Sequence, residues 1–418
     1  MKFSRFGTRF TRQSGILQLM DDLGRALSTH RDMLMLGGGN PAHIPEVQVY
    51  FRQRMNDMLN NPGEFERAIG NYDSPQGNSI FIDSLADMLR KNCGWDVGPE
   101  NIALTTGSQS SFFYLFNLLG GQFDGGREKQ ILFPMVPEYI GYSDLGIDDN
   151  LFTAVRPIIE HLDDRLFKYR VDFNNLKIDD GIGAICISRP TNPTGNVVTD
   201  KELQRLAKMA ESQGIPLIID NAYGLPFPNI LFTEANPLWN DNVIVCMSLS
   251  KLGLPGGRTG IVVANEEIIQ VLSNMTAILN LAPGGLGPIL AQDLVATGDI
   301  LRLSHEVIQP FYQSKAKRAV SLLQETLKGI EYYIHNPEGA IFLWLWLDGV
   351  PIDSQQLYER LKKRGVLVVP GHYFFPGLEE EWRHRQECLR ITYSQSDEIV
   401  ERGIKIIGEV VRAAYEIT

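Results

Sequence analysis

Apolar segments of two kinds alternate along the first two thirds of the chain. Residues 47–59, 79–91, 111–119 and 199–213 carry apolar side chains at helical spacing, and Thr199 and Glu202 are spaced as a capping box. Between them lie short apolar runs typical of buried strands: 101–105, 130–133, 183–188, 216–220, 243–247 and 261–264. Strands alternating with helices predict an α/β fold with a mostly parallel sheet covered on both faces.

The pattern changes near residue 300. A helical stretch at 303–327 precedes apolar strands at 340–347, 366–369 and 389–393 and helices at 353–364 and 397–414. A chain of 418 residues is too long for a single core. We therefore expect a large domain over residues 46–300 and a smaller α+β domain over residues 301–418.

Five residues that could bind a ligand or take part in catalysis each follow a predicted strand: Gly107, Tyr139, Asn192, Asp220 and Lys251. Ligands of parallel sheets bind at the carboxyl ends of the strands, so we expect all five to line one edge. Around Gly107, a strand, a glycine and hydroxyls at a helix start would present backbone N–H groups to an anion. A capped helix without a ligand is the alternative for this motif alone.

The segment 248–260, S-L-S-K-L-G-L-P-G-G-R-T-G, places Lys251 between two strands among hydroxyls and glycines. A lysine that forms a Schiff base needs an amine desolvated enough to lose its proton. An exposed lysine in a Gly-Pro turn is the other interpretation of this segment by itself.

Composition excludes several functional classes. The formal net charge of −11 argues against nucleic acid and anionic membrane as partners. The uncharged stretch 268–292 is interrupted by glycines and prolines, which excludes a membrane span. Four scattered cysteines and no signal-peptide core predict a cytoplasmic protein with reduced thiols, and the histidine spacing predicts no metal site.

Four motifs in order, N-P-T-G (192–195), D-N-A-Y (220–223), S-x-S-K with a downstream arginine (248–258) and L-R-I-T-Y (389–393), extend over much of the chain. Together they resemble fold-type I pyridoxal-phosphate enzymes and, within these, class I/II aminotransferases. The resemblance implies a large domain with a mostly parallel seven-stranded sheet. It also implies that residues 1–45 join the small domain and cover the active site.

The resemblance assigns roles to the candidate residues. Lys251 would hold the cofactor as a Schiff base and act as the base, with Asp220 on the pyridine nitrogen and Tyr223 as a further catalytic residue. The remaining cofactor contacts would come from Tyr139 on the ring face, Tyr223 and Asn192 on the phenolic oxygen, and Gly107, Ser108, Gln109, Ser248 or Ser250, and Arg258 on the phosphate. Tyr72 would reach the phosphate of a neighbouring subunit, making the active unit a homodimer. Arg390, with Gly39 and Asn192, would bind the substrate α-carboxylate.

The expected substrates are amino acids and 2-oxo acids. The motifs place no second arginine for a dicarboxylate, and Ile16, Leu17 and Met20, which resemble a pocket lid, are apolar. We therefore expect ping-pong exchange between L-valine (also alanine and 2-aminobutyrate) and pyruvate or 2-oxoisovalerate. The alternatives are another aliphatic or alanine aminotransferase, a β-lyase or γ-eliminase on the same scaffold, and a non-catalytic amino-acid-sensing regulator.

Overall fold

The computed structural model describes residues 1–11, 14–29 and 33–416. Its larger sheet has the strand order β2-β11-β10-β9-β8-β4-β3, with β5 also paired to β4. The strands are β2 (Ile102–Thr105), β3 (Gly121–Phe123), β4 (Arg127–Phe133), β5 (Phe152–Ala154), β8 (Ile182–Ser188), β9 (Leu217–Asp220), β10 (Val243–Ser248) and β11 (Gly260–Val263). Strands β5, β4, β8, β9 and β10 run parallel, and β11 is antiparallel to both of its neighbours.

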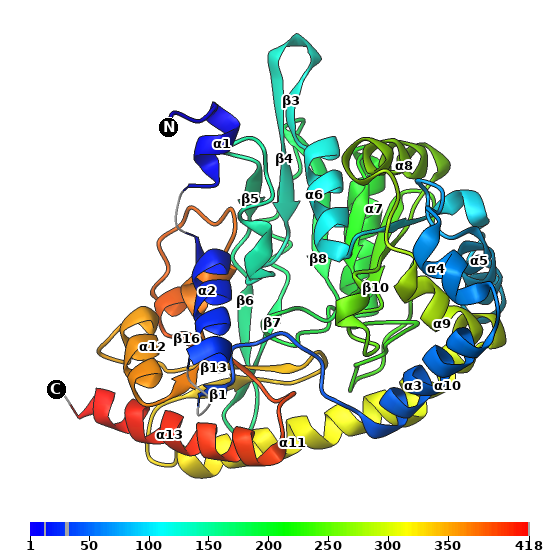
Figure 1. Ribbon diagram of the computed structural model, residues 1–418. Helices are drawn as coiled ribbons and strands as arrows, with labels where there is room; N and C mark the ends of the chain where they lie inside the picture. The colour runs from blue at the N-terminus through cyan, green and yellow to red at the C-terminus, as the bar shows by residue number, and fades with distance from the viewer. Residues whose placement is uncertain (12–13, 30–32, 417–418) are drawn as a thin grey trace.

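The sheet has eight strands where seven were expected. The additional strand, β3, has three residues and forms a hairpin with the first half of β4. In Figure 1 this hairpin projects from the end of the sheet. Its residues Gln122 and Phe123 are exposed, so β3 lengthens one edge without adding to the core.

Helices enclose the central strands. Every residue of β8, β10 and β11 is buried, as expected for strands covered on both faces. The surrounding helices include α3 (Pro45–Asn60), α4 (Glu64–Gly70), α5 (Ser79–Cys93), α6 (Ser108–Leu119), α7 (Asp200–Ser212), α8 (Glu266–Asn280) and α9 (Leu286–Thr297). The predicted capping box begins α7, where Thr199 accepts from the Glu202 N–H and Glu202 accepts from the Thr199 N–H.

A second sheet of six strands has the order β15-β16-β13-β12-β7-β6. Its strands are β6 (Ile158–His161), β7 (Leu166–Arg170), β12 (Tyr333–His335), β13 (Phe342–Trp346), β15 (Val369–Pro370) and β16 (Cys388–Thr392). Because β6 and β7 come from residues 158–170, a cut at residue 300 does not separate the two sheets. The helices α12 (Ser354–Lys363) and α13 (Asp397–Tyr415) complete this part of the molecule.

The N-terminal segment packs on the second part of the molecule. Strand β1 (Leu34–Met35) pairs in parallel with β14 (Val366–Leu367). Helix α2 (Gly15–Thr29) lies beside α12 in Figure 1, and Tyr358 and Lys362 of α12 both contact Asp22. Residues 15–29 and 34–35 are thereby held next to the second sheet.

A long helical segment connects the two halves. It consists of α10 (Asp299–Leu303), one π-helical turn (Ser304–Ile308) and α11 (Gln309–Thr326). The π turn ends two residues before Pro310, which has no backbone N–H to continue an α-helical ladder. Within the described ranges, no helix combines the length and apolarity that a membrane span requires.

Candidate active site

One cavity of about 910 Å³ opens at the carboxyl ends of β4, β8, β9 and β10. The structure brings twelve of the fourteen predicted site residues to its wall: Gly39, Ser108, Gln109, Tyr139, Asn192, Asp220, Tyr223, Ser248, Ser250, Lys251, Arg258 and Arg390. They come from both sheets and from the N-terminal segment, so the cavity lies where the three parts meet. In the part of the chain that the structure describes, no cluster of three or more His, Cys, Asp or Glu side chains could hold a metal ion.

Lys251 is a desolvated amine within this cavity. Its Nζ donates to the Gly39 carbonyl oxygen at 2.6 Å and lies 5.3 Å from the centre of the Tyr223 ring. Burial, together with the charges of Arg390 and Arg258, lowers the pKa of Lys251 to about 8 against the opposing charge of Asp220. A substantial fraction of this amine is therefore neutral near physiological pH, as a nucleophilic lysine requires.

Asp220 is the last residue of β9 and faces the same cavity. Its carboxylate accepts hydrogen bonds from the Tyr142 hydroxyl and, at 3.0 Å, from the Ala222 N–H. Burial raises the pKa of Asp220, while the Tyr142 hydrogen bond and the charge of Lys251 favour its ionised form. The side chain is thus an oriented acceptor suited to a protonated ring nitrogen.

Arg390 projects from β16 of the second sheet and is only 2% exposed. Its Nη1 donates to the Asn192 Oδ1 at 2.8 Å and its Nη2 to the Gly37 carbonyl oxygen at 2.6 Å, while Nε has no hydrogen-bond partner among the described residues. Burial lowers the pKa of Arg390 to about 10, which leaves it charged near neutrality. A buried planar cation at a cavity wall fits a carboxylate ligand.

The start of α6 and the segment after β10 form the anion-binding end of the cavity. Gly107, the N-cap of α6, has φ +93°, and a Cβ there would lie 2.3 Å from Arg258 Nη2. Arg258 therefore lies over the free N–H groups at the start of α6, and the two together suit a phosphate. Of the two candidate serines, Ser250 is 9% exposed, whereas Ser248 is 1% exposed and accepts from the Ser250 N–H.

Helix α2 closes the cavity with apolar side chains. Ile16, Leu19 and Met20, at positions i, i+3 and i+4, line it together. The expectation for Leu17 is wrong: this side chain is 48% exposed and does not line the cavity. A helix turns about 100° per residue, so Leu17 lies about 100° round α2 from Ile16 and about 160° from Leu19, outside the face that the three lining residues share.

Comparison with known proteins agrees with this geometry. The family model described as "Aminotransferase class I and II" matches residues 64–407. The chain is 54% identical over 415 residues to the valine–pyruvate aminotransferase of Escherichia coli strain K12, covering 99% of each protein. The chain belongs to the class I and II aminotransferases.

Two solved aminotransferase structures superpose closely on this one. The valine–pyruvate aminotransferase of Salmonella typhimurium LT2 matches with a TM-score of 0.89 and 50% identity, over 97% of this chain and 100% of that one. A protein from Psychrobacter arcticum 273-4, described as an amino-acid aminotransferase, matches with a TM-score of 0.97 and 49% identity over all of both chains. The agreement extends over both sheets and the N-terminal segment.

Two predicted site residues of this aminotransferase lie outside the cavity wall. Gly107 is just behind it, against Arg258. Tyr72, in the segment between α4 and α5, is 82% exposed and does not contribute to the cavity of its own chain. A side chain so exposed is available to a second subunit.

Sequence reasoning missed polar residues behind the cavity. Tyr142, which holds Asp220, follows Tyr139 by three residues in the same motif, so its position after β4 was the available signal. Glu138 is fully buried and accepts from the Ser188 N–H at 2.8 Å and from its hydroxyl; burial raises the pKa of Glu138 to about 8. No sequence pattern pairs Glu138 with Ser188, because the contact forms between two strand ends.

Proposed function

We propose that this aminotransferase exchanges the amino group between L-valine, and also alanine and 2-aminobutyrate, and pyruvate or 2-oxoisovalerate by a ping-pong mechanism. The observation that carries the proposal is the desolvated Lys251 amine, which shares one cavity with Asp220 and the buried Arg390. The 54% identity to the Escherichia coli enzyme supports valine and pyruvate as substrates.

The cavity fits pyridoxal phosphate. Lys251 offers the amine for the Schiff base and Asp220 an acceptor for the ring nitrogen. Tyr223 and Asn192 would contact the phenolic oxygen, and Tyr139 would pack on the ring. Gly107, Ser108, Gln109, Ser250 and Arg258 would hold the phosphate, with Ser248 supporting Ser250. When bound, pyridoxal phosphate supplies an electron sink for the negative charge that develops at the amino-acid Cα.

The remaining roles, which are substrate binding, proton transfer and exclusion of water, fall to side chains of this protein. Arg390 binds the α-carboxylate with its planar fork, and Asn192 and the Gly39 backbone complete that contact. Lys251, as a neutral amine, would be the base that takes the proton from the substrate Cα. Ile16, Leu19 and Met20 exclude water and favour small aliphatic side chains, which an apolar pocket separates by only about 1–3 kcal/mol per methylene.

We also propose a cytoplasmic homodimer in which Tyr72 contacts the phosphate in the neighbouring subunit. Exposed apolar side chains on the same side of the molecule support an interface: Ile69, Ile278 and Leu281 are 64%, 82% and 62% exposed. Gly285, shortly after α8, lies against Asp73, so these segments adjoin Tyr72. The four cysteines are all free thiols, as a reducing compartment requires.

Mixing two inactive variants tests the dimer. If Tyr72 completes the partner's site, Lys251→Ala and Tyr72→Ala chains combined in one dimer regenerate one intact site, and activity returns on mixing. Activity that stays absent after verified subunit exchange contradicts the shared site.

Half-reactions test the chemistry. Holoenzyme mixed with L-valine alone converts its lysine-bound cofactor to the amine form and releases one equivalent of 2-oxoisovalerate, and pyruvate restores the first spectrum. Ammonia released with oxo acid in the absence of an acceptor identifies a lyase instead. Binding of the pure protein to DNA without any turnover identifies a regulator.

A further inference from the structure

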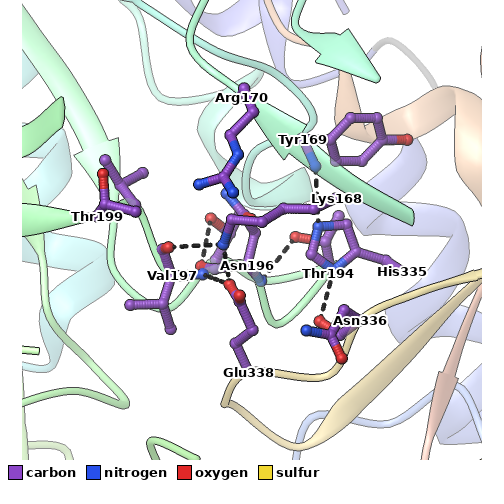
Figure 2. Close-up of polar contacts among 12 residues, drawn as sticks. Lys168, Tyr169, Arg170, Thr194, Asn196, Val197, Thr199, His335, Asn336 and Glu338 are labelled. Carbon is purple, nitrogen blue, oxygen red and sulfur yellow. Dashed lines mark hydrogen bonds and ion pairs between the residues drawn. The ribbon is translucent and has the colours of Figure 1, made fainter. Parts of the chain in front are cut away.

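A buried ion pair lies behind the wall that holds Asn192. Lys168 of β7 is 4% exposed, and its Nζ pairs with Glu338 Oε2 in the segment between β12 and β13. The same Nζ donates to the Val197 carbonyl oxygen at 3.0 Å, and the Val197 N–H donates to Glu338 Oε2 at 2.9 Å. Figure 2 shows Lys168 and Glu338 meeting at the backbone of Val197, so the ion pair clamps both the N–H and the carbonyl group of this residue.

The clamped residue directly follows a closed turn that contains Asn192. The Thr191 N–H donates to the Asn196 carbonyl oxygen at 2.9 Å, and the Gly195 N–H donates to the Thr191 carbonyl oxygen at 2.7 Å. These bonds make residues 191–196 a compact unit. Fixing Val197 therefore fixes the position of Asn192, whose Oδ1 accepts from Arg390.

The Glu338 side of the clamp also packs against this turn. A Cβ on Gly195 would lie 2.5 Å from the Gly339 carbonyl oxygen, so the two backbones are in direct contact. The Phe232 N–H donates to the Glu338 carbonyl oxygen at 2.7 Å, and the Ile230 N–H donates to the Tyr223 carbonyl oxygen at 2.8 Å. Residues 338–339 are thus wedged between the Asn192 turn and the segment that follows Tyr223.

Neighbouring groups leave the clamp electrically balanced. His335 accepts from the Tyr169 N–H through Nε2, and its Nδ1 lies 2.9 Å from the Asn336 carbonyl oxygen, an arrangement that suits the neutral ring. Burial and the charge of Lys168 keep the pKa of His335 well below its usual range. Arg170, the next cation, donates to Glu160 at 2.6 Å, so Lys168 and Glu338 chiefly neutralise each other.

A buried ion pair is weak evidence of a role in stability. Its desolvation cost offsets much of its attraction, and well-packed apolar residues often replace such pairs without loss of stability. What apolar residues cannot replace here is the pair of hydrogen bonds to Val197. The location of these bonds, one residue from the Asn192 turn, points to a role in the active site.

We propose that Lys168 and Glu338 are positioning residues that hold Asn192 against Arg390 and so set the affinity for the substrate α-carboxylate. This inference rests on the proposed aminotransferase function of the same cavity. Neither side chain lines the cavity, so the effect passes through Val197 and the turn at 191–196.

The test compares Lys168→Met, Glu338→Gln and the double variant Lys168→Met/Glu338→Leu as holoenzymes. The probe is isovalerate, which has the carbon skeleton and carboxylate of valine without its amine, titrated by calorimetry. We expect each single variant to keep its cofactor absorbance and to bind isovalerate about tenfold more weakly, because a small displacement of a binding group has large effects. The double variant leaves neither charge unpaired, so its unfolding temperature should return towards that of wild type. Its affinity for isovalerate should stay low, because the hydrogen bonds to Val197 are still missing.

Glu387→Gln is the matched control. Glu387 is a buried carboxylate of the same half of the molecule that pairs with Arg383 and accepts from Trp346, and it does not line the cavity. We expect it to lower the unfolding temperature and leave isovalerate binding unchanged. Wild-type affinity for isovalerate in the double variant would overturn the positioning role, as would equal losses of affinity in Glu387→Gln. Wild-type enzyme that neither binds isovalerate nor transaminates valine would instead refute the proposed function.

Discussion

Replacing Arg390 by lysine tests the carboxylate site without removing its charge. In the structure the guanidinium divides its donors between Asn192 and Gly37, and the whole side chain is 2% exposed. Lysine offers a single ammonium on a flexible stem and cannot donate along two parallel directions to one carboxylate. The variant keeps the cation and loses one charge-assisted hydrogen bond to the substrate.

The expected magnitude follows from that lost bond. A hydrogen bond to a charged group contributes about 1.5–3 kcal/mol, which corresponds to a loss of about 10- to 150-fold in kcat/KM for L-valine. Arg390→Ala also removes the charge, and truncating one partner of a buried charge pair costs about 2–5 kcal/mol or more. We therefore expect a larger loss in the alanine variant than in the lysine variant.

Steady-state kinetics with L-valine and pyruvate provide the assay, with cofactor absorbance as the measure of an intact site. Both variants should retain the lysine-bound cofactor, because Arg390 contacts the substrate end of the cavity and Arg258 the phosphate end. A KM for valine equal to that of wild type in the alanine variant would refute the assignment of Arg390 to the carboxylate.

Three further outcomes follow from the geometry. Because only the neutral amine reacts and burial lowers the pKa of Lys251 to about 8, the rate at which cofactor-free enzyme takes up pyridoxal phosphate should rise with pH and level off above about 8; a rise that continues towards 10.5 would contradict this environment. Gly107→Ala combines a positive φ with a clash against Arg258, so cofactor affinity measured by equilibrium dialysis should fall about tenfold or more, and unchanged affinity would place the phosphate elsewhere. Ile16→Ala should lower the kcat/KM ratio of valine to alanine about fivefold, at roughly 1 kcal/mol for the lost contact, while Leu17→Ala, one residue along, should leave that ratio unchanged.

The central strands and their following loops could be predicted because local patterns determine them. Residues 182–187 form an apolar run that is followed by Ser188 and residues that favour a turn, and the structure has β8 at 182–188. Parallel strands bring their carboxyl ends to one edge, so the sequence alone predicts that Asn192, Asp220 and Lys251 lie together. The capping box at Thr199 gave the start of α7 in the same way.

Other elements depend on partners far away in the sequence. Strands β6 and β7 contain Glu160, His161, Lys168 and Arg170, and their charged residues hide the apolar alternation. They form because β12, more than 160 residues later, supplies the edge on which β7 pairs. Lysine is almost never fully buried without a partner, so the sequence does not predict that Lys168 is buried. Its partner Glu338 comes next to it only in the folded chain.

The candidate site shows the same difference between residues that local motifs predict and residues that depend on distant parts of the chain. Motifs pointed to the residues that are proposed to contact the cofactor, but not to the residues that hold them, such as Tyr142 behind Asp220. The sequence alone leaves Ser248 and Ser250 equivalent as proposed phosphate ligands. The Ser248 hydroxyl already accepts from the Ser250 N–H, which favours Ser250 for that role. The error at Leu17 arose because the resemblance to a lid gave the segment but not the helical phase of α2.

The most direct test of the central claim is a single-turnover half-reaction of the holoenzyme with L-valine in the absence of any oxo acid. We predict that wild-type enzyme releases one equivalent of 2-oxoisovalerate per site, with conversion of the lysine-bound cofactor to its amine form. Lys251→Ala, folded by circular dichroism, should release none. Release of 2-oxoisovalerate at the wild-type rate by Lys251→Ala would contradict the account.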